Sequence, residues 1–390
     1  MWWGEATLNT DREDNLLADD RAYWLAWSQV PRVGPVLLRR LQQHFDTLAE
    51  AWASPGRELG QVEGFGRQLV QAVEKTRSHL NPQQFLEQHC SKNPYFWTPA
   101  DPDYPRLLLE IPSPPPVLYY RGQVDQQENQ GMKPMVAIVG TREPTDYGKR
   151  WTRKISAALA KKGFTVVSGM AAGIDTEAHK GCLEAGGRTV AVFGTGIDVI
   201  YPPRNKLLYE TILDRGLVLS EYPAGTKPNR PHFPQRNRII AGLSRAVLVM
   251  EAPTKSGALI TAYQANEFCR DVYALPGSLD NPNAVGCLGL LNRGASVILS
   301  EGHLLEMLGA IPELDTGKQL SLFEPEPVKA TPKLAPELAK VFQVLGIEPT
   351  PLDVIVQETG MTVAEVSGVL LQLELEGLVS QLPGMLYRRN

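Results

Sequence analysis

The segment of residues 168–175, Ser-Gly-Met-Ala-Ala-Gly-Ile-Asp, constrains the fold of this 390-residue chain more than any other. It follows the apolar run 164–167 and precedes the helix-like run 176–185, so we expect a buried strand to end in a turn that opens a helix. Gly169 and Gly173 permit unusual dihedral angles and a close approach of the backbone. Such a turn presents free N–H groups and the positive end of a helix dipole, which can hold an anion, but the same turn also occurs without a ligand.

Five more short apolar runs share this pattern of a strand that ends in small or polar residues. Apolar runs that alternate with helical patterns are typical of a parallel sheet covered on both faces. Ligands of such sheets bind outside the carboxyl ends of the strands. We therefore expect an α/β fold with a Rossmann-like doubly wound, mostly parallel sheet. The runs are residues 136–139, 189–193, 217–219, 246–250 and 272–275.

Helical patterns precede this region. Two amphipathic runs follow the turns at Gly34 and Gly64, and each predicts a helix–turn–helix hairpin. Residues 1–94 are thus expected to form an all-α domain of the helix-hairpin-helix or SAM-like kind, which either offers N–H groups to phosphates or serves only as a packing module. Proline-rich residues 95–122 should lead, as an extra strand, into the sheet domain of residues 95–310.

The C-terminal part is expected to be a linker and a small module. Residues 311–332 mix Pro, Glu, Asp, Lys and Thr with few large apolar residues, which is the composition of a flexible linker. Residues 333–390 predict three helices and a hairpin that turns at residues 383–384, the pattern of a winged helix.

The candidate recognition helix of this module, residues 363–377, carries no lysine or arginine. It does carry Glu365, Glu374 and Glu376. A helix that reads DNA needs basic residues for phosphates and polar residues for base edges. The winged helix is therefore expected to contact a protein or to regulate, rather than to read a duplex.

Composition excludes several classes of protein. No uncharged run approaches the length of a membrane span, and the polar N-terminus does not resemble a secretory signal. The four cysteines form no C-x-x-C pair, which favours a reduced, cytoplasmic setting. The histidines do not cluster with cysteines or carboxylates, so no metal and no cofactor is expected.

A basic surface loop is the second candidate for a binding site, despite the formal net charge of −4. Between Tyr222 and Met250 there is no Asp or Glu, and Phe233 lies among the basic residues. This loop is either a solvated surface or a polyanion site with an aromatic stacking face, as single-stranded nucleic acids require. Its basic residues are Lys227, Arg230, Arg236, Arg238 and Arg245.

Taken in order, these motifs resemble the DNA-processing protein A family, called DprA or Smf, over residues 95–300. Two departures stand out, since Leu288 replaces the family's usual Asn and Ala258 replaces a common second Ser. The matching pieces are residues 139–142, 168–175 with His179, 195–198 with Tyr201-Pro202, 220–221, 233–242, Glu251, 256–257, 260–262, 276–277 and 294–295.

The resemblance implies a dimeric Rossmann-like protein that binds single-stranded DNA. It further implies loading of the RecA recombinase onto strands covered by single-strand binding protein during natural transformation, with no catalytic step. The strand ends and the basic loop supply the expected DNA-binding residues. These are Gly140, Arg142, Ser168, Gly169, Gly173, Gly194, Lys206, Phe233, Arg236, Asn237, Arg238, Ser256 and Gly257.

The alternative is a Rossmann-like nucleotide-processing hydrolase. A dinucleotide enzyme or a Walker-loop NTPase is disfavoured, because neither glycine pattern is present. Asp175, Glu221 and Glu251 nevertheless follow strands and could do acid–base work. Structural roles are open to each: Asp175 could cap its helix or bond to His179, and Glu251 could pair with an arginine.

Overall fold

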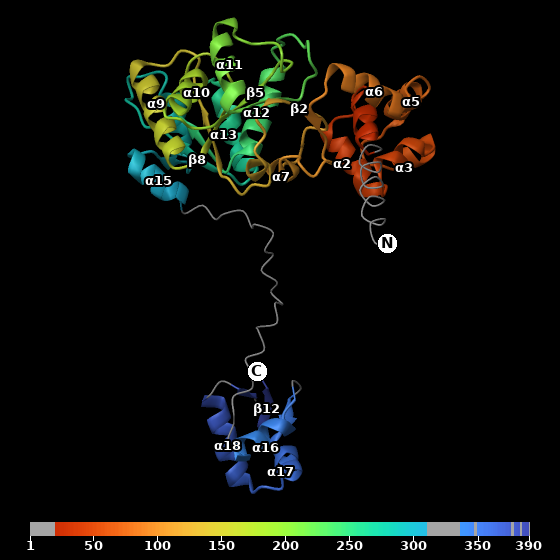
Figure 1. Ribbon diagram of the computed structural model, residues 1–390, viewed down its shortest axis with the longest axis vertical. Coiled ribbons are helices and arrows are strands. Elements are labelled where there is room, and N and C mark those ends of the chain that lie inside the picture. Colours follow the sequence, from red (N-terminus) through yellow and green to blue (C-terminus); the bar gives the residue numbers. More distant parts are fainter. Residues whose placement is uncertain (1–19, 310–335, 347–348, 376–377, 383, 390) are drawn as a thin grey trace, which may run out of the picture. The chain divides into compact units, whose positions relative to one another are not determined.

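The computed structural model describes residues 20–309, 336–346, 349–375, 378–382 and 384–389. The chain divides into two compact units, residues 1–317 and 318–390, and each is described by itself. The first contains the large sheet and the N-terminal helices. The second contains the small C-terminal module (Figure 1).

A nine-stranded, mostly parallel sheet forms the centre of the first unit. Its strands follow the order β1-β2-β6-β5-β4-β3-β7-β8-β9. The strands from β3 to β9 pair in parallel, and β1 and β2 add an antiparallel edge, which confirms both the doubly wound fold and the extra strand. The strands are β1 (Phe96–Trp97), β2 (Leu118–Gly122), β3 (Met135–Val139), β4 (Thr165–Ser168), β5 (Thr189–Phe193), β6 (Leu217–Ser220), β7 (Ala246–Val249), β8 (Asp271–Ala274) and β9 (Ser296–Val297).

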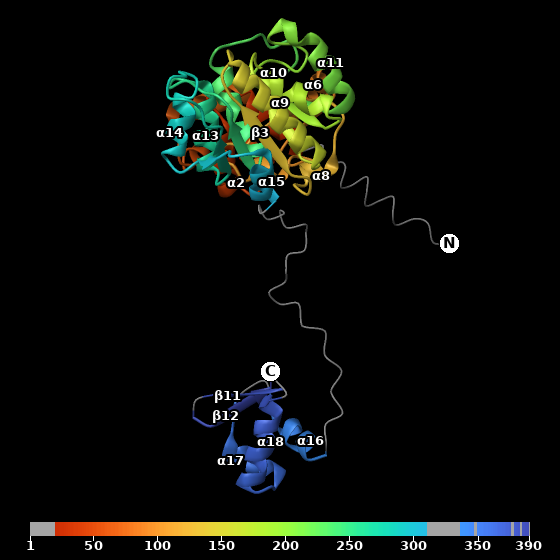
Figure 2. The ribbon, with the colours of Figure 1, turned by 90° about the vertical axis from the view of Figure 1, so that its left-hand side faces the viewer.

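Helices cover both faces of this sheet (Figures 1 and 2). Successive strand side chains point to opposite faces, so Val136 and Ile138 enter one core while Ala137 and Val139 enter the other. The first face carries α9 (Asp146–Lys161), α10 (Ile174–Glu184), α11 (Lys206–Arg215) and α15 (Glu301–Gly309). The second carries α7 (Arg106–Leu109), α12 (His232–Leu243), α13 (Gly257–Glu267) and α14 (Val285–Leu291).

The strand order reverses between β3 and β7, which are direct neighbours in the sheet. From β3 the chain proceeds through β4 and β5 in one direction, and from β7 through β8 in the other. In open α/β sheets a crevice opens at the carboxyl ends of the strands where the order reverses. The architecture therefore places a binding crevice beside the residues that follow β3 and β7.

The sequence suggested that the acid-free segment after β6 is a surface loop, but much of this segment is helical. Residues 232–243 form α12, and Ile239, Ile240 and Leu243 of that helix are buried in the core. Pro234 lies in the first turn, where a missing N–H costs no helical hydrogen bond. The helix consequently fixes Phe233, Arg236 and its neighbours against the sheet.

The N-terminal helices have their own apolar core around Trp24 and Trp27. They also contact the β1–β2 edge, since the Arg21 guanidinium donates to the Phe96 carbonyl at 2.8 Å and pairs with Asp101 at 3.4 Å. The helical prediction for this region is confirmed, while the boundary at residue 94 stays a prediction. The helices are residues 20–28, α2 (Pro35–His44), α3 (Leu48–Ala53), α4 (Gly56–Leu59), α5 (Arg67–Arg77) and α6 (Pro82–Lys92).

The second unit is a winged helix, as predicted. Its three-stranded sheet has the order β10-β12-β11, and three helices pack around one apolar core. The expected linker at residues 311–332 lies outside the described residues. The elements are α16 (Pro336–Val344), β10 (Thr350–Pro351), α17 (Leu352–Thr359), α18 (Val363–Leu375), β11 (Val379–Leu382) and β12 (Leu386–Arg389).

None of the helices in the described ranges is by itself long and apolar enough to cross a membrane. Helices α17 and α18 of the winged helix are long and apolar enough only when they are taken together, and the chain bends by 110° between them. In the same ranges, no group of three or more His, Cys, Asp and Glu residues is arranged to hold a metal ion.

Candidate nucleic-acid interface

A groove of about 760 Å³ lies where the crevice is expected, at the carboxyl ends of β3 and β7. The turn after β3 and the first turns of α12 and α13 form its walls. These three segments come from distant parts of the sequence, and the strand reversal brings them together. The expected contact residues that line the groove are Gly140, Arg142, Phe233, Arg236, Asn237, Ser256 and Gly257.

The turn of residues 168–175 is not an empty anion cradle. Asp175 Oδ2 accepts hydrogen bonds from the N–H groups of Gly169 at 3.1 Å and Ala171 at 3.2 Å. Burial raises the pKa of Asp175, while the charge of Arg236 and these two N–H groups act in the opposite direction. The chain thus supplies its own carboxylate to both N–H groups, which favours the structural alternative for this turn, and the DNA contact of Gly169 stays a prediction.

Two more expected residues of this turn have structural roles. The Ser168 hydroxyl is buried and donates to the Ile138 carbonyl at 2.6 Å, which joins β4 to β3. Gly173, with φ +82°, is the N-cap of α10, so Asp175 is not the cap. A Cβ at position 173 would lie 2.4 Å from the Thr141 carbonyl oxygen, so glycine is required for this close approach.

Arg236 brings a buried cation to the groove. Its side chain is only 4% exposed, and Nη1 donates to the carbonyls of Gly169, at 2.8 Å, and Val192. Burial lowers the pKa of Arg236 to about 10, although the nearby Asp175 carboxylate raises it. The guanidinium is thus held mainly by carbonyl groups rather than by a carboxylate in contact with it.

Arg142 and Arg230 add exposed positive charge to the same groove. Neither has an ion-pair partner among the residues that the structure describes. The Arg142 guanidinium lies 5.7 Å from the centroid of the half-buried Phe233 ring. Unpaired cations beside an aromatic face are suited to a phosphate backbone that carries unpaired bases.

Arg238 is arranged differently. Its guanidinium forms two bonds with Glu221, at 2.8 and 2.7 Å, and donates to the Ser113 carbonyl at 3.0 Å. It does not line the groove. The structure gives Arg238 a structural ion pair, so its phosphate contact stays only a prediction.

Two remaining expected residues lie outside the groove lining. Lys206 is exposed at the start of α11. Gly194 lies beneath Phe233, since a Cβ there would come within 2.9 Å of the ring. Gly194 therefore allows the ring to pack closely.

Tyr201 is a groove residue that the sequence reasoning quoted as a motif but did not assign to the site. Its ring is 41% exposed and lies 5.5 Å from the Phe233 ring, between centroids. The two rings form one aromatic wall. The signal was the apolar Tyr-Pro pair between glycine-rich and basic residues, where a tyrosine has little reason to be buried.

The carboxylates that could have served a hydrolase are bonded to other groups of the chain. Glu251 accepts from the Thr145 N–H at 2.8 Å and hydroxyl at 2.6 Å, and from Asn281 at 3.2 Å. The interpretation that Glu251 pairs with an arginine is therefore wrong, because its partners are Thr145 and Asn281. Glu221 pairs with Arg238, as described above.

His179 does not bond to Asp175 either. Its Nδ1 lies 2.7 Å from the Thr189 hydroxyl, which itself donates to the Val166 carbonyl, so the imidazole N–H donates to the hydroxyl. Burial, together with the charge of Arg236, lowers the pKa of His179 to about 3. The imidazole is consequently neutral and joins α10 to the sheet.

The comparison with known proteins identifies the family. Residues 95–309 match the sequence profile described as DNA recombination-mediator protein A, and residues 325–385 match the DprA winged helix domain. The chain belongs to the DprA family. The resemblance drawn from the motifs is thereby confirmed, and with it the class of DNA-processing recombination mediators.

Two relatives and one solved structure cover between 73% and 95% of the chain. Protein Smf of Synechocystis sp. is 57% identical over 394 residues, which include 95% of this chain and 99% of that protein. Protein Smf of Escherichia coli is 38% identical over 289 residues, with 73% and 75% covered. The X-ray structure of DNA processing protein A from Streptococcus pneumoniae superposes with a TM-score of 0.62 at 36% identity, covering 73% of this chain and 95% of that one.

Proposed function

We propose that this DprA family member binds single-stranded DNA in the groove at the carboxyl ends of β3 and β7. The observation that carries the proposal is that Arg142 and Arg230, which line the groove with the Phe233 ring, have no ion-pair partner in the described part of the chain. The arginines neutralise phosphates, and the ring stacks on a base. In a duplex the bases are already stacked and paired, so the ring favours single strands.

The wider role that we propose is that of a recombination mediator. The chain would act as a homodimer in the cytoplasm and load RecA onto incoming single strands during natural transformation. It needs no cofactor and no catalytic step for this role. The engagement of Asp175, Glu221 and Glu251 by other groups of the chain supports a binding protein over a hydrolase.

A titration of labelled single- and double-stranded oligonucleotides of one sequence, followed by fluorescence anisotropy, tests the binding proposal. We expect tighter binding of the single strand, with an affinity that falls as salt rises. Equal or tighter binding of the duplex would contradict it. Binding should persist in EDTA and without ATP, and its loss on chelation would reveal a metal site.

The mediator and the hydrolase are separated by two further measurements. RecA should displace single-strand binding protein faster when this protein is present, and an unchanged rate would remove the loading step. Incubation with nucleoside monophosphates should release no free base. Release of base would establish the hydrolase instead.

A further inference from the structure

The segment that carries Arg142 into the groove has no regular secondary structure. It spans residues 140–145, between the end of β3 and the start of α9. The Arg142 side chain is exposed and has no ion-pair partner among the described residues, so it does not itself fix the segment. The place of its guanidinium in the groove therefore depends on what holds the backbone of residues 140–145.

The carboxylate of Glu251 holds the end of this segment. Glu251 follows β7 and is 2% exposed, and it accepts from the Thr145 N–H at 2.8 Å and from the Thr145 hydroxyl at 2.6 Å. The same hydroxyl accepts from the Gly148 N–H at 3.2 Å as the N-cap of α9. A Cβ at position 148 would collide with the carboxylate, so the two groups are closely packed. One carboxylate thus fixes both the end of the segment and the first turn of α9.

The loop between β8 and α14 holds the segment from another side. Asn281 of this loop donates to Glu251 Oε1 at 3.2 Å, and Asn283 donates to the Glu143 carbonyl at 3.0 Å. The backbone carbonyl of Glu251 accepts from the Thr141 N–H at 2.7 Å. Both chain neighbours of the groove arginine are consequently hydrogen-bonded, one to Glu251 and the other to the loop that Glu251 contacts.

The Glu251 carboxylate is held without a cation. None of the lysines and arginines in the described ranges forms an ion pair with it. Three hydrogen bonds satisfy it, and it lies at the N-terminus of α9, where the helix dipole favours a negative charge. Glu251 therefore neutralises no groove arginine while it holds the segment that carries one of them.

We propose that Glu251 is a positioning residue for DNA binding, whose carboxylate holds residues 140–145 in the arrangement that places the Arg142 guanidinium against a phosphate. Glu251 does not line the groove, so it acts through Arg142 and not on the strand. A backbone that is fixed before binding lowers the cost of ordering it on the ligand. This inference rests on the proposed function, because it concerns how the same groove is built.

A double-mutant cycle with Arg142→Ala tests whether Glu251 acts through Arg142. Glu251→Gln keeps the shape of the side chain, but an amide cannot accept from all three donors. We expect Glu251→Gln to weaken single-strand binding about tenfold and to reduce the slope of log affinity on log salt by roughly 0.7, the value for one lost phosphate contact. In the Arg142→Ala protein, the same substitution should cause no further loss.

The direction of the effect separates geometry from charge. Glu251→Gln removes a negative charge near the groove, which by itself would strengthen the binding of a polyanion. Full or increased affinity in Glu251→Gln, or equal losses with and without Arg142, would overturn the inference while the unaltered protein still binds single strands. Failure of the unaltered protein to bind them would overturn the proposed function.

Thr145 offers a second, matched pair of variants if Glu251→Gln does not fold. Thr145→Val keeps the shape but removes the hydroxyl that donates to Glu251, so single-strand affinity should fall by about threefold. Thr145→Ser keeps the hydroxyl and should bind like the unaltered protein. The loss in Thr145→Val should also disappear in the Arg142→Ala protein, with urea denaturation to verify that each variant is folded. Equal affinities of the valine and serine variants, or a loss that persists without Arg142, would overturn the inference.

Discussion

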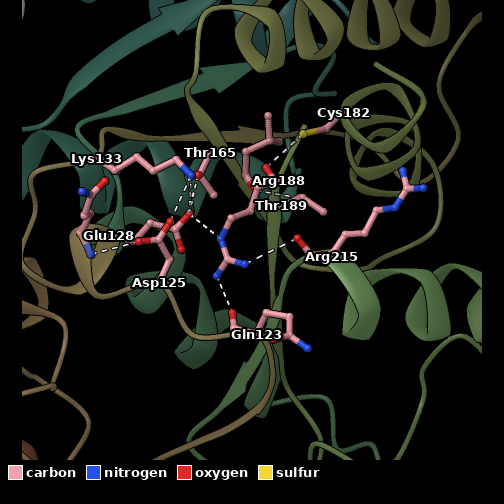
Figure 3. A network of polar contacts seen from close by, with 11 residues as sticks. Gln123, Asp125, Glu128, Lys133, Thr165, Cys182, Arg188, Thr189 and Arg215 are labelled. Atoms are coloured by element: carbon pink, nitrogen blue, oxygen red, sulfur yellow. Dashed lines mark hydrogen bonds and ion pairs between the residues drawn. The ribbon is translucent and has the colours of Figure 1, made fainter. Parts of the chain in front are cut away.

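At the amino ends of β3 to β6, charged side chains of opposite sign pair with one another and form a matched cluster. At the carboxyl ends of β3 and β7, by contrast, Arg142 and Arg230 have no ion-pair partner among the described residues. Figure 3 shows the matched cluster. Glu128 accepts from the Thr165 hydroxyl and from Arg188 Nε at 2.7 Å, and Lys133 bonds to Asp125 at 3.2 Å. Glu128 is almost wholly buried.

Both terminal nitrogens of Arg188 also donate to backbone carbonyls. Nη2 donates to the Gln123 carbonyl, and Nη1 to the Arg215 carbonyl at 3.5 Å (Figure 3). This cluster ties the segments before β3, β4, β5 and β6 together. Its two carboxylates pair with Lys133 and Arg188, so no bound ligand is needed to neutralise the cluster.

The groove differs from this cluster because no carboxylate within it pairs with its arginines, which can therefore interact with solvent or with a bound anion. Arg142 and Arg230 have no carboxylate at ion-pair distance in the described part of the chain, and Arg236 is bonded to carbonyl and amide oxygens. A buried ion pair that is broken leaves a costly unpaired charge, while an exposed cation loses little when it is removed. Substitutions at the amino ends should therefore affect stability, and those in the groove should affect binding.

Glu128→Ala should give the largest effect. It removes the carboxylate from a buried pair and leaves Arg188 Nε and the Thr165 hydroxyl without the acceptor that they share, so the free energy of unfolding should fall by about 3–5 kcal/mol. Urea denaturation measures the loss. The single-strand affinity of the protein that remains folded should not change. Glu128→Gln, which keeps an acceptor, should lose less, and a loss below about 1 kcal/mol in the alanine variant would remove the distinction between the two ends.

Acidification should also act on the fold through His179. Its pKa is about 3 in the folded protein, so the unfolded chain, with a pKa near 6.5, takes up the proton first. Stability is therefore fully present above about pH 6.5 and is lost as the pH falls toward about 3. Between about pH 7 and about pH 5 the loss from this residue is about 2 kcal/mol.

His179→Gln is the matched variant for this pH dependence. It has no titrating ring, so the difference in unfolding free energy between about pH 7 and about pH 5 should be about 2 kcal/mol smaller than in the unaltered protein. Chemical denaturation at both pH values measures it. The same pH dependence in both proteins would show that His179 is not buried and neutral.

The periodicity of apolar residues predicted the sheet because burial on both faces requires continuous apolar runs. The run at 189–193 corresponds to β5, and the run at 246–250 ends one residue beyond β7. The alternation of strands and helices was therefore readable from the sequence. The order of the strands and its reversal between β3 and β7, which decide where the groove lies, came from the structure.

The partners of the charged side chains could not be predicted from the sequence. Glu221 lies just before the acid-free segment, and only the folded α12 brings it to Arg238. Asp175 was recognised beside the glycine turn, but its side chain could turn either out to cap α10 or back onto the turn that precedes it. Which partner a charged residue meets depends on tertiary contacts, and these decide which arginines stay free for DNA.

The variants Arg142→Ala and Arg238→Ala compare a groove arginine that has no ion pair in the described chain with a nearby arginine that is ion-paired to Glu221. Arg142→Ala should weaken single-strand binding about tenfold at low salt, or 1.4 kcal/mol, and reduce the slope of log affinity on log salt by roughly 0.7. Its unfolding free energy should not change. Arg238→Ala leaves the half-buried Glu221 without a partner, so it should lower stability and leave the salt slope unaltered.

Anisotropy at several salt concentrations and urea denaturation separate the two variants. Arg142→Lys serves as the control, because it should keep the salt slope. If Arg238→Ala reduced the slope as Arg142→Ala does, the ion pair with Glu221 would open on binding. An unchanged slope in Arg142→Ala would exclude Arg142 from the site.

The smallest effect is expected from deleting residues 331–390, which contain the winged helix. Its α18 exposes Glu365 and Glu374 and carries no basic residue, so it would repel a phosphate backbone. Arg389 is bound to the Phe342 carbonyl, which leaves Arg388 as the exposed arginine of the described part of β12. Single-strand affinity should therefore stay within about threefold, a change below about 0.7 kcal/mol. Anisotropy with the truncated protein, whose fold is verified by circular dichroism, measures it, and a loss of about tenfold or more would show that the wing grips DNA through Arg388.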